Sequence, residues 1–92
     1  MRFTWTEAKR RSNLTKHGLD FADAENVFTR PMVLFEDQRA DYGEQRMIGI
    51  GLFGALVVLV VHVESHESIH VISMRKATQN ETHLYFQETG YF

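Results

Sequence analysis

The most apolar stretch of the chain covers residues 56–63 and reads Leu-Val-Val-Leu-Val-Val-His-Val. Apolar residues occupy both alternating sets of positions in it, β-branched residues dominate, and neither Gly nor Pro interrupts it. Such a run predicts a central strand that is covered on both faces of a sheet. It is far too short to span a bilayer, which requires about 20 apolar residues.

Two further apolar stretches flank this strand and predict a three-stranded antiparallel meander with residues 56–63 in the middle. Residues 47–52 lead into Phe53-Gly54, which predicts a two-residue turn. Residues 65–68 are polar and predict a second loop, after which residues 69–74 resume an apolar pattern.

These loop lengths determine which residues face each other across the predicted meander. They pair Ile50 with Val57, and Leu59 with Met74. We expect one apolar, helix-covered face that consists of Ile48, Ile50, Val57, Leu59, Val61, Ile72 and Met74. The opposite face then consists of Gly49, Gly51, Val58, Val60, His62, Val71, Ser73 and Arg75. In this register Arg75, Ser73 and His62 share the face opposite the core.

Helix signals precede the meander. Thr6 is a suitable N-cap and Gly18 a suitable stop for a helix over Glu7–His17, whose apolar content is limited to Ala8 and Leu14. Asp20 begins a second predicted helix, which Pro31 ends. The residues of this helix that we expect in the core, because they follow helical spacing, are Phe21, Ala24, Val27 and Phe28.

Three short segments and a third helix complete the pattern. Residues 2–5 predict an edge strand, residues 32–35 another strand, and residues 36–43 a polar loop. Residues 78–81 form a capping box for a C-terminal helix, which has Leu84 and Tyr85 on its apolar side and Gly90 as its stop. The predicted order is β-α-α-β-β-β-β-α, an α+β domain over residues 1–92 with an antiparallel sheet.

Composition adds a local basic surface to this picture. The net charge is −2, which argues against strong overall attraction to nucleic acid. Half of the ten Lys and Arg residues nevertheless lie within the first sixteen positions, namely Arg2, Lys9, Arg10, Arg11 and Lys16. The first helix should therefore present a basic face to phosphate or to an acidic segment of a partner.

Other features limit the chemistry. There is no cysteine, so neither a disulfide nor a thiolate zinc site is available. His62, His66 and His70 recur every fourth residue, but the predicted register places His62 and His70 on opposite faces. We therefore expect neither a metal site nor a cofactor. The chain starts without the apolar segment of a signal peptide, and we expect a cytoplasmic protein without a membrane association.

Side chains suited to metal-free RNA cleavage are present. Such cleavage requires a group that deprotonates a 2′-hydroxyl, a group that protonates the leaving oxygen, and cations that stabilise the charge on phosphorus. The chain supplies these types in Lys16, His17, Glu44, Arg46, His62, Arg75 and Lys76. Each also has an ordinary structural interpretation, such as a solvated strand end or a surface ion pair, and the residues alone leave both open.

Several short sequence motifs together resemble those of the BrnT-type toxins of type II toxin–antitoxin modules. Near the N-terminus they are Trp5-Thr6-Glu7-Ala8-Lys9, Asn13-Leu14-Thr15-Lys16-His17-Gly18, and Phe21-x-x-Ala24-x-x-Val27-Phe28 with Pro31. Further on they are Tyr42-Gly43-Glu44-x-Arg46, Gly51, and Val71-Ile72-Ser73-Met74-Arg75-Lys76-Ala77-Thr78 with Glu81 and Tyr85. The matches follow the family order along nearly the whole chain.

This resemblance implies a fold like that of the RelE-type ribonucleases, with a curved antiparallel sheet, two N-terminal helices and one C-terminal helix. It implies RNA cleavage that inhibits translation. The implied partner is a BrnA-type antitoxin, a DNA-binding protein of ribbon-helix-helix type, and the complex represses its own operon. Operator DNA would be contacted only through the antitoxin. A dimer and a heterotetramer with the antitoxin are both compatible with the sequence.

The resemblance and the predicted register together suggest roles for individual residues. Arg75 is assigned to the phosphate and the transition-state charge, with His62 or His17 as the proton-transfer group. Glu44 and Arg46 remain catalytic candidates, and the residues expected to bind RNA are Lys9, Arg10, Lys16 and Lys76.

The chain departs from the family pattern at two positions. Ser65 and His70 stand where the family usually has arginines, so we expect weaker catalysis because each lost cation removes charge stabilisation. The alternative is a catalytically weakened or inactive homologue that acts as a binding and co-repressor module. A structural or adaptor domain would explain the fold but not the combined motifs.

Overall fold

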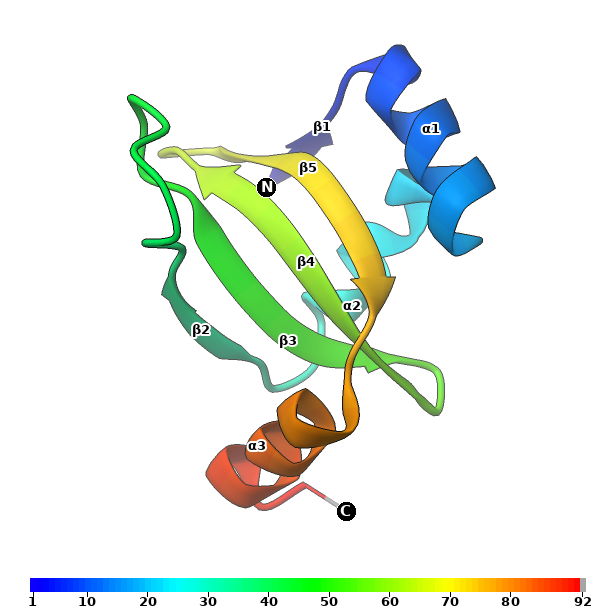
Figure 1. The fold of residues 1–92 in the computed structure, drawn as a ribbon, viewed down its shortest axis with the longest axis vertical. Helices are drawn as coiled ribbons and strands as arrows, with labels where there is room; N and C mark the ends of the chain where they lie inside the picture. The colour runs from blue at the N-terminus through cyan, green and yellow to red at the C-terminus, as the bar shows by residue number, and fades with distance from the viewer. Residues whose placement is uncertain (92) are drawn as a thin grey trace.

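In the computed structural model, which describes residues 1–91, five strands form one sheet with helices packed on it (Figure 1). The elements are β1 (Arg2–Thr4), α1 (Glu7–His17), the 3-10 helix η1 (Phe21–Asp23), α2 (Ala24–Val27), β2 (Val33–Glu36), β3 (Met47–Phe53), β4 (Leu56–Glu64), β5 (Ser68–Lys76) and α3 (Gln79–Thr89). The strand order is β1-β5-β4-β3-β2. The α+β class, the order of the elements and the meander around β4 are confirmed.

The two faces of the sheet are both apolar, as the sequence of β4 predicts. One face, here called the α2 face, packs Val58, Val60 and Val71 against η1 and α2. The other, the α3 face, packs Ile50 and Leu59 against Tyr85 of α3. Burying apolar side chains on both faces contributes about 25 cal/mol for each Å² removed from water. The prediction of a single helix-covered face is therefore too simple.

The first strand departs from the predicted antiparallel arrangement. It pairs in parallel with β5, with Phe3 opposite Ile69 and Thr4 opposite His70. No hairpin connects these two strands, so no turn dictates their relative direction. The sheet is therefore mixed, with one parallel pair at the β5 edge and antiparallel pairs elsewhere.

The boundaries of α1 are confirmed, and the helix is mostly exposed, as its limited apolar content indicates. The Thr6 hydroxyl accepts from the Lys9 N–H at 3.4 Å, and Gly18 adopts a left-handed φ of 72°. Ala8 and Leu14 are both exposed, and the buried residue of this helix is Asn13. The reason is that α1 lies against the edge of the sheet at β5 rather than over an apolar face.

The second predicted helix is split into two short pieces, η1 and α2. Asp20 begins it as predicted, because its carboxylate accepts from the Ala22 N–H at 3.0 Å. Phe21, Ala24 and Val27 are fully buried and spaced by three, which matches the period of a 3-10 helix. The core-facing residues are thus as predicted, with Phe28 partly buried, while the regular helix ends at Val27, before Pro31.

The β3–β4 hairpin turns one residue later than predicted. Phe53 pairs with Leu56, so the loop is Gly54-Ala55, and Gly54 occupies its first position with a φ of 61°. Pairing shifts by two residues, with Ile50 now opposite Leu59. Because strand faces alternate with a period of two, this shift leaves every side chain of β3 on its predicted face.

A bulge in β5 changes the predicted faces. Val61 pairs with Ser73 whereas His62 pairs with Val71, so Ile72 is an extra residue in β5. Beyond the bulge, Met74 turns to the α2 face and Arg75, opposite Leu59, turns to the α3 face. The prediction that Arg75, Ser73 and His62 share a face is therefore wrong, because a bulge reverses the alternation of the residues that follow it.

The C-terminal helix follows its predicted signals. Thr78 and Glu81 form the reciprocal capping box, and Gly90 ends the helix with a φ of 63°. Tyr85 is fully buried, and its hydroxyl donates to the carbonyl of Pro31 at 2.8 Å. Among residues 1–91, no helix is long and apolar enough to cross a membrane.

Candidate functional site

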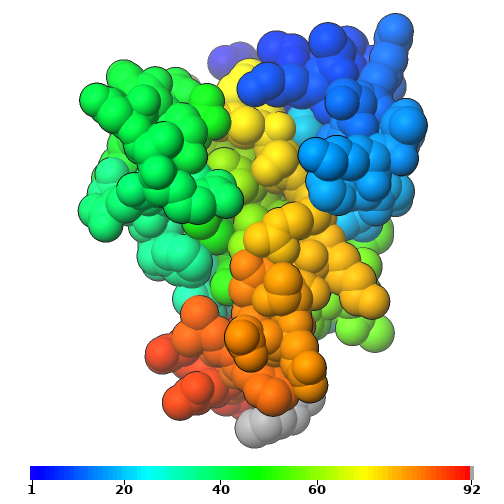
Figure 2. Space-filling view, in the orientation of Figure 1, coloured from blue at the N-terminus to red at the C-terminus, as the bar shows by residue number. Residues whose placement is uncertain are grey.

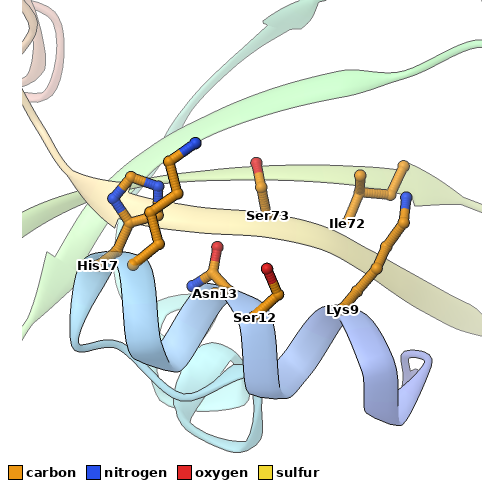
Figure 3. Close-up of a pocket in the computed structure, with 7 residues that line it drawn as sticks. Lys9, Ser12, Asn13, His17, Ile72 and Ser73 are labelled. Carbon is orange, nitrogen blue, oxygen red and sulfur yellow. The ribbon is translucent and has the colours of Figure 1, made fainter.

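A pocket of about 220 Å³ lies between α1 and the bulged part of β5 (Figure 3). The side chains that line it are Lys9, Ser12, Asn13, Lys16, His17, Ile72 and Ser73. Ile72 and Ser73 both line it because the bulge directs two consecutive residues toward one side of the strand. Three of the predicted site residues, Lys9, Lys16 and His17, are thus brought together.

Asn13 fixes α1 against β5 at the base of this pocket. Its Nδ2 donates to the carbonyls of Met74 at 2.8 Å and Leu19 at 3.1 Å, and its Oδ1 accepts from the Met74 N–H at 3.1 Å. These bonds satisfy both backbone groups of Met74, where β1 no longer pairs with β5. One side chain therefore replaces a neighbouring strand at this position, and it sets the distance between the α1 cations and β5.

The basic residues of α1 divide into two groups. Lys9 and Lys16 are exposed, line the pocket, and form no ion pair within residues 1–91. Arg10, by contrast, pairs with Glu7 at 3.0 Å and with Asp20 at 3.1 Å. The two lysines are available to an anionic ligand, whereas Arg10 links α1 to the start of η1.

Arg75 lies on the α3 face, as Ser73 does, but its guanidinium is already engaged. Nη1 and Nη2 donate to the two carboxylate oxygens of Glu81 at 2.9 and 3.0 Å. The ion pair lowers the pKa of Glu81, chiefly through these hydrogen bonds from Arg75. Arg75 therefore joins the end of β5 to the first turn of α3, and it remains partly exposed.

His62 is separated from the pocket. Its side chain has no exposed surface and lies on the α2 face against Phe28, with ring centroids 5.0 Å apart. Its Nδ1 lies 3.1 Å from the Val60 carbonyl oxygen and its Nε2 lies 2.9 Å from a carboxylate oxygen of Glu64. The prediction that His62 and His70 face opposite sides is confirmed, but His62 is a buried residue rather than one on the sheet surface.

Glu44 and Arg46 lie in the β2–β3 loop, residues 37–46, and not in the pocket between α1 and β5. They form an ion pair at 3.3 Å, and the Arg46 guanidinium stacks over the Tyr42 ring with its Cζ 4.1 Å from the ring centroid. Lys76 is exposed at the end of β5 and pairs across the sheet with Val58, so it is directed away from the α3 face.

The same loop contains a buried carboxylate. Asp37, only 3% exposed, accepts from the Arg39 side chain at 2.8 and 2.7 Å and from the Tyr42 hydroxyl at 3.2 Å. The hydrogen bonds from Arg39 lower the pKa of Asp37 to about 2. The Asp37 N–H also donates to the Arg46 carbonyl at 2.7 Å, so the loop is closed at its base.

The comparisons with known proteins establish the family. The family model for the ribonuclease toxin BrnT of type II toxin–antitoxin systems matches residues 5–81. The chain belongs to the BrnT family. The crystal structure of the ribonuclease toxin BrnT of Brucella abortus shares 38% sequence identity with it at a TM-score of 0.67, over 86% of this chain and 99% of that one. A search of the curated proteins found no match.

The match to the BrnT family includes the pocket residues of both α1 and β5 and the whole β2–β3 loop. His70 and Ser65, the two departures from the family pattern described above, each have a hydrogen-bond partner. His70 faces the α3 side, with its Nδ1 2.9 Å from the Thr4 hydroxyl, and the Ser65 hydroxyl lies 2.6 Å from that of Ser68 in the β4–β5 turn.

Sequence reasoning missed Asn13 and Ser12 as residues of this site. Asn13 is the informative omission, because a polar residue with weak helix propensity in the middle of a helix calls for a specific hydrogen-bonding partner. The sequence therefore indicates that Asn13 has a hydrogen-bonding partner. It does not identify that partner as the backbone of Met74, because this depends on the position of α1 beside β5.

Proposed function

We propose that this protein is an endoribonuclease toxin that binds single-stranded RNA at the α1–β5 pocket and cleaves it, and so inhibits translation in the cytoplasm. The observation that supports this most is the convergence of Lys9, Lys16 and His17 on one open pocket in a member of the BrnT family. Two unpaired lysines attract a phosphate. The imidazole of the histidine beside them is a group that can accept or donate a proton.

The proposed reaction uses the 2′-oxygen of the RNA as its nucleophile. This oxygen attacks the neighbouring phosphorus as its proton is removed, and the bond from phosphorus to the 5′-oxygen breaks as that oxygen is protonated. We assign one proton transfer to His17, and the stabilisation of negative charge on the phosphate to Lys9 and Lys16. Arg75, on the same face as Ser73, is a further source of positive charge if it exchanges Glu81 for RNA.

The test is cleavage of a messenger RNA by the purified protein in the presence of EDTA. We expect cleavage to persist, because the charge stabilisation in this proposal comes from side chains. His17→Ala should reduce the cleavage rate by about 100-fold or more, which is the lower range for loss of a general acid–base group. RNA that stays intact at high protein concentration, or cleavage that EDTA abolishes, would contradict the proposal.

The matched control for the pocket is Arg11, which lies on the same helix, is exposed, and does not line the pocket. Lys9→Glu and Lys16→Glu should each weaken RNA binding and cleavage strongly, whereas Arg11→Glu makes the same charge change and should have little effect. Equal losses in all three variants would indicate only a general effect of net charge.

We further propose that the neutralising partner is a BrnA-type antitoxin and that the complex represses its own operon. The support is membership of a family of type II toxins and the basic, unpaired surface of Lys9 and Lys16, which suits an acidic segment. The purified toxin should fail to shift operator DNA in a gel, and the complex should shift it. Binding of operator DNA by the toxin alone would contradict this arrangement.

A second candidate function is that of an inactive co-repressor. It is favoured by the absence of arginine at positions 65 and 70 and by the engagement of Arg75 with Glu81. Expression without an antitoxin distinguishes the two, since an active ribonuclease arrests growth and a co-repressor does not. If growth arrest occurs and is lost in His17→Ala, the protein is not solely a co-repressor.

A further inference from the structure

The β2–β3 loop holds an aromatic ring and a guanidinium together in a fixed stack. Arg46 lies over the Tyr42 ring, and its Nε donates to Glu44 at 3.3 Å. The Tyr42 hydroxyl donates to the buried carboxylate of Asp37 at 3.2 Å, and Arg39 holds that carboxylate in place. The stack is therefore anchored at both ends, and its orientation does not depend on a ligand.

Phe35 lies on the α3 face of β2, two residues before Asp37. The bond from the Asp37 N–H to the Arg46 carbonyl extends the β2–β3 ladder one pair beyond Glu36 and Met47. Because side chains alternate along a strand, Phe35 and Arg46 point to the same face and are diagonal neighbours, roughly 7–8 Å apart. Phe35 is 40% exposed, so its ring is accessible to a ligand.

The loop and the α1–β5 pocket open on the same side of the molecule. Figure 2 shows the loop in green and α1 in blue on one visible face, with β5 in yellow between them. At about 4.8 Å between neighbouring strands, β5 lies about 10 Å from β3 and about 14 Å from β2, which carries Phe35. An RNA strand bound in the pocket can therefore extend across β5 and β4 toward the loop.

We propose that Phe35, Tyr42 and Arg46 form a stacking surface for a nucleobase of single-stranded RNA that flanks the nucleotide cleaved at the α1–β5 pocket. This inference rests on the proposed ribonuclease function. Unpaired bases are bound by stacking on aromatic rings and on guanidinium planes. Arg46 already pairs with Glu44, so the surface offers flat π faces rather than a free positive charge, which favours a base over a phosphate as its ligand.

The stacking surface also gives Glu44 and Arg46 a different role from catalysis. Glu44 holds the guanidinium, and Arg46 supplies a plane beside Phe35 and Tyr42. These residues would then determine which nucleotide is preferred beside the cleaved bond, through differences in stacking strength among the bases.

The test uses short RNA oligonucleotides that contain the mapped cleavage site, with a 2′-deoxy nucleotide there to prevent cleavage. Removing one base at a time identifies the position where the wild-type protein loses affinity, measured by fluorescence anisotropy. Tyr42→Leu and Tyr42→Phe both lack the hydroxyl and differ in the aromatic ring, so they form a matched pair. Phe35→Leu tests the exposed ring without touching the Asp37 network.

We expect Tyr42→Leu and Phe35→Leu to bind the intact oligonucleotide about 10-fold more weakly than the wild type, and Tyr42→Phe to bind it nearly as well. Removing the base at the critical position should cause no further loss in the two leucine variants. Circular dichroism and melting temperatures establish that the variants are folded.

Two results would overturn the inference alone. One is equal RNA affinity for Tyr42→Leu, Phe35→Leu and the wild type, while the wild type cleaves RNA. The other is a loss of antitoxin binding without any loss of RNA binding, which would make this surface a contact for the protein partner. If the wild type neither binds nor cleaves RNA, the proposed function and this inference fail together.

Discussion

At the scale of single residues, Asn13 shows how one side chain determines where a helix lies. Its three hydrogen bonds join α1, the segment after α1, and β5. The sequence indicated that α1 would be mostly solvated, and this is confirmed. It did not indicate that a polar residue would be the buried one, because hydrophobic periodicity reports apolar contacts and not bonds to a sheet edge.

Asn13→Ala should lower the free energy of unfolding by about 3 kcal/mol, because it leaves the buried backbone groups of Met74 without partners. Asn13→Asp should be at least as destabilising, because it places a carboxylate against the carbonyls of Met74 and Leu19. Urea denaturation measures both effects. Ser12→Ala, at the exposed neighbouring position, is the control and should change stability by less than about 0.5 kcal/mol.

The lowered pKa of the buried Asp37 carboxyl group predicts that the stability of the fold depends on pH. Its pKa is lowered to about 2 in the folded protein and is about 3.9 in an unfolded chain. The unfolded state thus binds more protons between these values, so this stabilisation is fully present above about pH 4 and is lost as the pH falls toward 2. Melting temperatures of the wild type should fall more steeply over this range than those of Asp37→Asn. Parallel curves for the two proteins would contradict the prediction.

At the scale of elements, the Arg75–Glu81 pair connects β5 to α3 across the Ala77-Thr78 connection. Arg75→Ala should lower the free energy of unfolding by about 1 kcal/mol, since the pair is bidentate but partly exposed. For a domain of this size that is a fall in melting temperature of about 4–8 °C. The assignment of Arg75 from the sequence, to the phosphate and the transition-state charge, includes no such structural role.

Glu81→Gln separates this structural role from a role in RNA cleavage. It weakens the same ion pair while leaving Arg75 in place, so calorimetry should find it similarly destabilised. If Arg75 also contacts the phosphate, RNA cleavage should fall in Arg75→Ala and not in Glu81→Gln. Equal activity of the two variants would limit Arg75 to the structural role.

Local signals in the sequence predicted most of the helices and strands. Interactions between residues far apart in the sequence determined the features that were not predicted. Thr6, Gly18, Thr78 and Gly90 act through neighbouring backbone groups, and each does what its sequence context predicts. The bulge at Ile72 has no such signal, because it depends on how β5 pairs with β4 and not on neighbouring residues alone. Faces before the bulge were therefore predictable, and those of Ser73, Met74 and Arg75 were not.

At the scale of the whole molecule, a net charge of −2 is combined with an unpaired basic pocket. RNA affinity should therefore decrease with salt despite the overall negative charge. For a single strand the slope of log K against log salt is about −0.7 for each phosphate contact, so replacing Lys9 and Lys16 with Ala should make it shallower by about 1.4. Anisotropy titrations at several salt concentrations measure this slope. Arg11→Ala should leave it nearly unchanged, and an equal change there would argue against a localised site.

The pairing of β1 with β5 has a consequence for synthesis on the ribosome. The α1–β5 pocket combines residues from the first 17 positions with Ile72 and Ser73, and β1 pairs with residues 68–70. A growing chain therefore contains Lys9 and Lys16 early. It lacks the β5 side of the pocket until almost all of the chain has been made. The pocket proposed to bind RNA can therefore form only after β5, the last strand, has emerged from the exit tunnel.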